Sequence, residues 1–117
     1  MTEGDRTTYQ HALSYIGLIF KGISEGTDHP LDTCRRIIAM PSRLAPRFTE
    51  LVDQRQPRAM AMLAYVFASM KLLEEKVMWF KGVAELQVPK IHAQLPAAWK
   101  DMAKWPLDIA LGRVTNT

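Results

Sequence analysis

The stretch from Arg58 to Lys71 constrains the fold more than any other part of the sequence. Its large apolar residues would occupy every side of a helix, namely Met60, Met62, Leu63, Tyr65, Val66, Phe67 and Met70. A helix that is apolar all round must be enclosed by other elements. Pro57 favours a helix start just before this stretch, because proline suits a first helical turn. The sequence therefore predicts a central helix over about residues 57–71.

Helical periodicity also covers most of the chain before the central helix. Tyr9–Ile23 places apolar residues at steps of three and four, and Thr7 or Thr8 can cap its start. Two shorter apolar faces follow, over residues 31–38 and 44–52. A residue that precedes proline is driven away from the helical conformation, so Met40 and Pro41 predict a break between these two faces.

A further helical pattern runs from Val77 to Gln94. The charged stretch 71–76 before it fits either a turn or an uninterrupted helix. Pro89 lies inside the pattern and predicts a kink near Glu85, because proline lacks a backbone donor. Prolines then delimit short closing helices at Leu95-Pro96 and Trp105-Pro106. No segment of useful length alternates apolar and polar residues with the period of two that is typical of a β-strand. We therefore predict an all-α bundle of about five main helices.

Length and composition fit one domain. The chain has 117 residues, of which 48% are apolar and 23% charged, enough for one core. We expect a single helical domain over 1–117, with a core at 8–112 and tails at 1–7 and 113–117. No uncharged run approaches the roughly 20 apolar residues of a membrane span, and the polar start lacks the pattern of a secretory signal. We expect an intracellular protein, cytoplasmic or nuclear, without a membrane span.

Cysteine, histidine and charge exclude several kinds of site. Cys34 is the single cysteine, and the three histidines are far apart in sequence, so neither an internal disulfide nor a structural zinc site at familiar spacing is expected. We interpret Cys34 as a small buried hydrophobe. A net charge of +3 is too modest to indicate nucleic-acid binding.

A series of short motifs is more distinctive. The run Arg55–Tyr65 begins R-x-P-R-A and continues with small and apolar residues. It follows the Met40-Pro41 pair and a P-x-F-x-x-L segment that starts at Pro46, and it precedes Trp79, Leu95-Pro96-Ala97-Ala98-Trp99 and Trp105-Pro106-Leu107. In this order the motifs resemble the C-terminal regulatory region of fungal zinc-cluster transcription factors, a group that includes sterol-uptake regulators. The resemblance covers about residues 9–111.

The resemblance implies the fold of the ligand-responsive end of such factors, where an apolar pocket among helices takes up a sterol-like or other lipophilic small molecule. The six-cysteine cluster that binds zinc and DNA in this family has no counterpart in these 117 residues. We therefore expect no metal, no cofactor and no direct nucleic-acid contact. Since the family's region is longer than this chain, we expect exposed apolar surfaces and a homodimer or higher oligomer.

The candidate ligand-binding residues are soft or aromatic side chains that can line an irregular lipophilic pocket. They are Met62, Tyr65, Phe67, Met70 and Trp79. Packing in the core is the competing interpretation of these residues. Arg58 starts the central helix, and we expect it to pair with Glu50 or Asp53 and hold the preceding helix.

The sequence leaves three functions open. The first is a domain that binds a lipophilic small molecule. The second is a stand-alone, cofactor-independent fungal biosynthetic enzyme, a cyclase or isomerase of a terpenoid or polyketide intermediate, because Met1–Asp5 reads as a natural start. Its candidate catalytic residues are His11, Tyr15 and Tyr65. The third is a competitor that dimerises with a full-length factor.

Overall fold

The computed structural model describes residues 3–26 and 28–112 and confirms the all-α fold. Its longer helices have 8 to 23 residues, in agreement with the prediction of about five main helices. In chain order the elements are α1 (Glu3–Glu25), α2 (Pro30–Arg43), α3 (Pro46–Asp53), α4 (Pro57–Leu73), the 3-10 turn η1 (Met78–Phe80), α5 (Val83–Gln94), α6 (Ala97–Lys100), the 3-10 turn η2 (Asp101–Ala103) and α7 (Lys104–Ala110).

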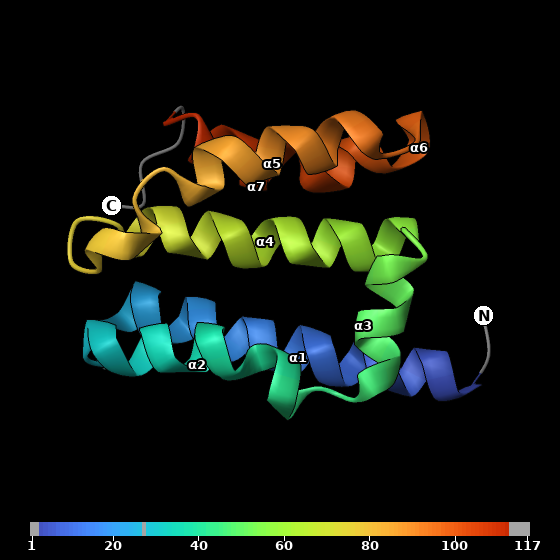
Figure 1. Cartoon of the computed structure of the whole chain (residues 1–117), viewed down its shortest axis with the longest axis horizontal. Coiled ribbons are helices and arrows are strands. Elements are labelled where there is room, and N and C mark those ends of the chain that lie inside the picture. Colours follow the sequence, from blue (N-terminus) through green and yellow to red (C-terminus); the bar gives the residue numbers. More distant parts are fainter. Residues whose placement is uncertain (1–2, 27, 113–117) are drawn as a thin grey trace.

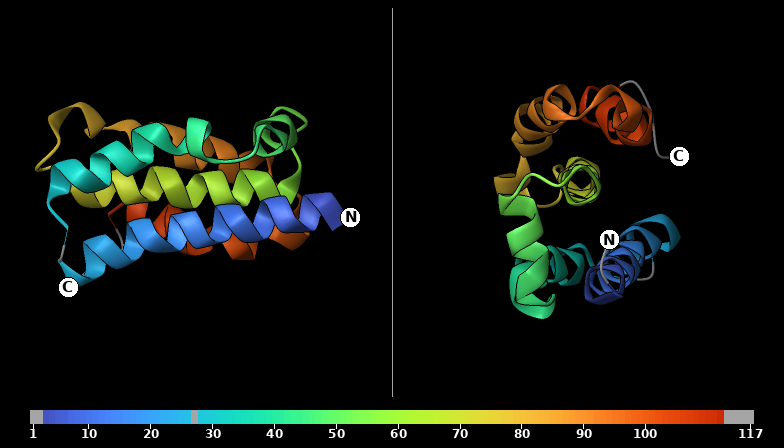
Figure 2. Two further views of the ribbon diagram at one scale, coloured as in Figure 1. Left: turned by 90° about the horizontal axis from the view of Figure 1, so that it is seen from below. Right: turned by 90° about the vertical axis from the view of Figure 1, so that its right-hand side faces the viewer.

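Helix α4 lies at the centre of the bundle, as its composition predicts. Figure 1 shows it between a layer formed by α1 and α2 and a layer formed by α5 and α7. In the end-on view of Figure 2, α3 runs along one side from the layer of α1 and α2 to α4. The central position explains why α4 buries residues around its circumference, including Ala59, Ala64, Val66 and Leu73.

The core is divided into two clusters by α4. The first joins α4 to α1, α2, α3 and η1 and includes Ile19, Phe48 and Val66. The second joins α4 to α5, η2 and α7 and includes several small residues, such as Ala64 and Ala84, beside larger ones such as Ile91. Cys34 is 2% exposed within the first cluster, which confirms its interpretation as a small buried hydrophobe.

Helix α1 begins earlier than predicted. It starts at Glu3, and the Thr7 and Thr8 hydroxyls donate to the carbonyls of Glu3 and Gly4 instead of capping the helix. Acidic residues in a first turn interact favourably with the helix dipole, and Glu3 and Asp5 supply them here. Most of the predicted tail at 1–7 is therefore helical, whereas residues 1–2 and the predicted tail at 113–117 lie outside the described residues.

The predicted break between the two faces exists, but it lies at Leu44 and Ala45 instead of at Met40 and Pro41. Helix α2 continues through Pro41 to Arg43, and the backbone N–H of Leu44 donates to the carbonyl of Met40. Proline removes one backbone donor, but the loss falls in the last turn, where the helix is about to end. Helix α5 also contains a proline, Pro89, which lies in its interior and not in its last turn.

The stretch 71–76, for which the sequence left two interpretations, contains the end of α4 and a turn. The helical pattern predicted over 77–94 is divided as well. Its first residues form η1, and α5 begins only after Gly82. Gly82 has φ of 81°, in the left-handed region that favours glycine. This conformation separates η1 from α5.

Candidate ligand-binding groove

A mainly apolar groove of about 390 Å³ lies beside α4, where α1 and the α6–η2 segment face each other. In the end-on view of Figure 2, α4 lies between α1 and the C-terminal helices. Helix α1 contributes four lining residues, α4 contributes four, and α6 and η2 contribute one each. They are Leu13, Ile16, Gly17, Phe20, Arg58, Ala61, Met62, Tyr65, Trp99 and Met102.

Residue size explains why the groove stays open. Ile16 and Ala61 are buried, whereas Leu13 is 61% and Met102 58% exposed although both are large and apolar. Gly17 follows Ile16 on α1 and is exposed, and a Cβ added to it would meet nothing within 4 Å. The absence of a side chain at Gly17 therefore widens the groove, and its apolar walls remain in contact with solvent.

Three aromatic rings pack at one end of the groove. The Phe20 ring lies 6.3 Å from Tyr65 and 5.5 Å from Trp105, and the Tyr65 and Trp105 rings stack at 5.7 Å. The Tyr65 hydroxyl donates to the carbonyl of Met102 over 3.0 Å, which ties α4 to η2. Burial raises the pKa of Tyr65 above its ordinary value.

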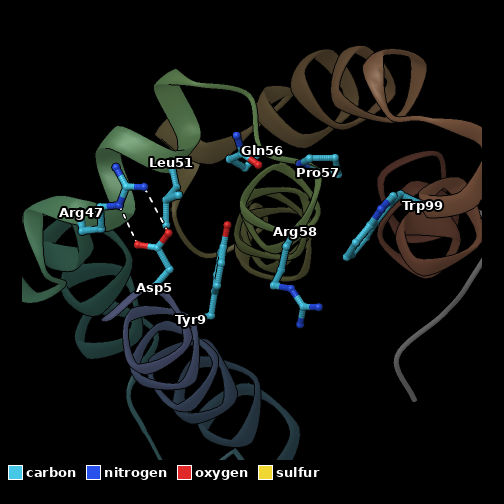
Figure 3. A pocket seen from close by; sticks show the side chains of 8 residues that line it. All are labelled: Asp5, Tyr9, Arg47, Leu51, Gln56, Pro57, Arg58 and Trp99. Carbon is cyan, nitrogen blue, oxygen red and sulfur yellow. Dashed lines mark hydrogen bonds and ion pairs between the residues drawn. The ribbon is translucent and has the colours of Figure 1, made fainter. Parts of the chain in front are cut away.

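Arg58 lies at the other end of the groove. Its guanidinium carbon is 5.6 Å from the centre of the Tyr9 ring and 5.4 Å from that of the Trp99 ring. Figure 3 shows the Arg58 side chain between these two residues. Both distances are within the range of cation–π attraction. The predicted pairing of Arg58 with Glu50 or Asp53 is wrong, because the side chain extends between α1 and α6 rather than toward α3.

A neighbouring hollow of about 370 Å³ shares Arg58 and Trp99 with the groove and is more polar. In it, Arg47 of α3 donates to both carboxylate oxygens of Asp5 of α1, over 2.7 and 3.1 Å (Figure 3). Arg47 also donates to Glu50 over 3.3 Å. Hydrogen bonds to these two carboxylates raise the pKa of Arg47. This network joins α1 to α3 beside the groove.

The structure separates the predicted ligand-binding residues. Met62 and Tyr65 line the groove. Phe67 packs against the cluster between α4 and α5, and Met70 packs against the cluster on the other side of α4. Trp79 lies on η1 and is 66% exposed. Five predicted residues on nearly one helix were expected to share a pocket, but an enclosed helix directs its side chains to different neighbours.

Sequence reasoning missed most of the groove. Leu13, Ile16 and Phe20 belong to the apolar stripe of α1 and were interpreted as its buried face. The one available signal was Gly17, a glycine in the middle of that stripe with no turn to explain it. Trp99 stood in a family motif without an assigned role.

The predicted catalytic residues do not share one hollow. His11 is exposed on α1. The Tyr15 hydroxyl donates to the carbonyl of Arg36 over 2.5 Å, and Tyr15 lines a different, polar hollow next to α2. Only Tyr65 lies at the groove. Within residues 3–26 and 28–112, no three His, Cys, Asp or Glu side chains are grouped so that they could hold a metal ion.

The described residues thus define an all-α bundle with an open apolar groove beside its central helix. The chain is similar to a Zn(2)-C6 fungal-type transcription factor of Gibberella zeae, with 28% identity over 105 residues. The match covers 88% of this chain and 19% of that protein, so the chain spans about a fifth of the relative's length. This similarity agrees with the resemblance seen in the motifs.

No profile of a known protein family matches the chain, and no solved structure matches it. In the part of the chain that the structure describes, no helix is both long enough and apolar enough to cross a membrane.

Proposed function

We propose that this chain is a regulatory domain that binds a lipophilic small molecule in the groove between α1, α4 and the α6–η2 segment. The observation that carries the proposal is a solvent-accessible groove whose walls are large apolar side chains, Leu13, Phe20 and Met62 among them. Its volume of about 390 Å³ is within the usual range for small-molecule sites. An apolar guest would remove these walls from water.

The regulatory part of the proposal is supported by the similarity to a fungal transcription factor. A ligand that contacts both α1 and α6 would favour one spacing of the two layers around α4, and such differential binding is how a ligand shifts a conformational equilibrium. A nuclear or cytoplasmic location belongs to the same proposal. The enzyme alternative gains no support from geometry, because His11 and Tyr15 do not line the groove.

A homodimer is part of this proposal. Several large apolar residues outside the groove are exposed, and exposed apolar surface favours association. They include Leu18, Ile38, Met78 and Trp79. Sedimentation at micromolar concentration tests the dimer, and a clean monomer would contradict it.

Gly17 offers a test of the groove itself. Gly17→Phe would place a ring in the space where no atom lies within 4 Å of an added Cβ, and Gly17→Ala is the matched control because it leaves most of that space open. We would titrate each protein with Nile red, a neutral dye that fluoresces in apolar sites. We expect Gly17→Phe to weaken binding about tenfold, the effect of excluding roughly 60 Å² of apolar contact.

Equal affinity of the two Gly17 variants would show that the dye binds elsewhere and would reject the groove as the site. Absence of dye binding to the unmodified protein would reject the proposed function.

A further inference from the structure

We infer that the ligand of this groove is an anionic lipophile with one carboxylate, and that Arg58 binds the carboxylate while the apolar body lies along α1 and α4. The inference rests on the proposed function and specifies the chemical class of the ligand. It starts from an arginine that lies at an apolar groove without a carboxylate of its own.

Arg58 makes no hydrogen bond or ion pair with any residue in 3–26 or 28–112. Its guanidinium is held between the Tyr9 and Trp99 rings, a contact that uses the cationic charge but leaves the N–H donors available. Arginine presents these donors as a planar fork that matches both oxygens of a carboxylate. The two rings restrict the side chain before a ligand arrives, which lowers the entropy cost of binding.

The charges around Arg58 also favour an anion. Arg6 of α1 and Arg58 both line a small hollow of about 270 Å³ that shares Leu13 and Met62 with the groove. Arg6, like Arg58, forms no ion pair with the described residues. The acidic side chain at this end is Asp5, whose two oxygens already accept hydrogen bonds from Arg47.

The groove and the two neighbouring hollows meet at Arg58, and this arrangement indicates the shape of the ligand. Arg58 lines the apolar groove, the small hollow beside Arg6 and the polar hollow beside Asp5. A carboxylate at Arg58 would therefore adjoin the apolar walls on one side and solvent on the other. Its hydrocarbon body would extend past Ala61 and Met62 toward the ring of Tyr65. A neutral lipophile would fill the walls but would lack the negative charge that strengthens a hydrogen bond from the guanidinium.

The test compares dodecanoate with dodecanol, which share a hydrocarbon chain and differ in the head group. Both are titrated below their aggregation concentrations, by displacement of Nile red and by calorimetry. We expect dodecanoate to bind about tenfold more tightly, the value of one charge-assisted interaction at a partly exposed site. Arg58→Met keeps an aliphatic side chain and removes the charge. We expect the ratio of the affinities for dodecanoate and dodecanol to fall to about one in this variant.

Arg43→Met is the matched control. It removes the same charge from α2, where Arg43 lines the hollow near Tyr15 and not the groove, and we expect it to leave the tenfold preference unchanged. Dodecanol serves as the folding control, since its affinity for Arg58→Met stays close to the unmodified value only if the groove is intact.

Three outcomes contradict the inference in different ways. Equal binding of both probes to the unmodified protein overturns the carboxylate and leaves the lipophile-binding function in place. If Arg58→Met still prefers dodecanoate, or if Arg43→Met loses that preference, the carboxylate binds to cationic side chains other than Arg58. Absence of binding by either probe overturns the proposed function as well.

Discussion

The side of α4 that faces α5 and α7 is closely packed around several fully buried small side chains, whereas the side that faces α1 carries an open groove. Ala64 of α4, Val88 of α5 and Ala110 of α7 are all 0% exposed in one cluster. Across the groove, Leu13 and Met102 remain more than half exposed. Both sides belong to one helix that carries apolar residues around its whole circumference.

The difference shows that hydrophobicity alone does not make a packed core. Small residues on facing helices allow close approach and leave no space for a guest, and interiors packed in this way resist any change in volume. On the α1 side, Gly17 leaves space beside Ala61, and the neighbouring large residues reach the surface instead of one another. Space for a ligand arises where small residues lack a close partner.

The difference in packing between the two sides of α4 is tested most directly by enlarging Ala64. Ala64→Leu adds volume to a site without free space, and we expect the free energy of unfolding to fall by roughly 1–3 kcal/mol. The control is Ala61→Leu, because Ala61 lines the groove and a larger side chain can extend into it. Urea unfolding of both variants measures the difference. If Ala61→Leu costs as much as Ala64→Leu, the two sides of α4 are equally tight.

A smaller effect of opposite sign is expected at Gly17. Gly17→Ala removes a flexible residue from the interior of α1 without any clash, so it should raise the free energy of unfolding by roughly 0.5–1 kcal/mol. Gly82→Ala is the opposing control, since φ of 81° strains any side chain, and it should destabilise. Thermal melts of the two variants that shift in the same direction would contradict the assignment of space at Gly17.

The smallest effect concerns the hydrogen bond between Tyr65 and Met102. Tyr65→Phe removes this bond across the groove, and we expect a loss of roughly 0.5 kcal/mol at pH 8. The raised pKa of Tyr65 also makes its contribution to stability depend on pH. As the pH rises past the ordinary tyrosine pKa of 10.0, the Tyr65 hydroxyl ionises in the unfolded chain before it ionises in the folded protein. The stabilisation is present below pH 10 and is lost as the pH rises through the folded pKa.

The stability difference between Tyr65→Phe and the unmodified protein should therefore narrow from pH 8 to pH 11. Tyr9, whose pKa is also raised by burial first and by Asp5 second, titrates in both proteins and cancels in the comparison. A gap that stays constant over this range would show that Tyr65 remains as accessible in the folded protein as in the unfolded chain.

Local sequence signals predicted the elements well but erred where a neighbour changes their meaning. Thr7 and Thr8 have the chemistry of caps, yet α1 begins before them, where Asp5 is bound by Arg47 of α3. Pro41 has the chemistry of a break, yet α2 continues for two residues beyond it and ends only after Arg43. Arg58 was expected to pair with Glu50, but Glu50 accepts from Arg47, and no local pattern reveals which of two nearby arginines a carboxylate binds.

The sequence by itself determined the all-α class, the central place of α4 and the burial of Cys34, because helical period and apolar content are properties of a segment and its composition. Only the tertiary structure decided which residues surround the groove. Gly17, Arg58, Tyr65 and Trp99 come from three helices, and their proximity depends on how closely those helices approach one another. Helix separation is set by the sizes of facing side chains, and the sequence does not state which side chains face each other.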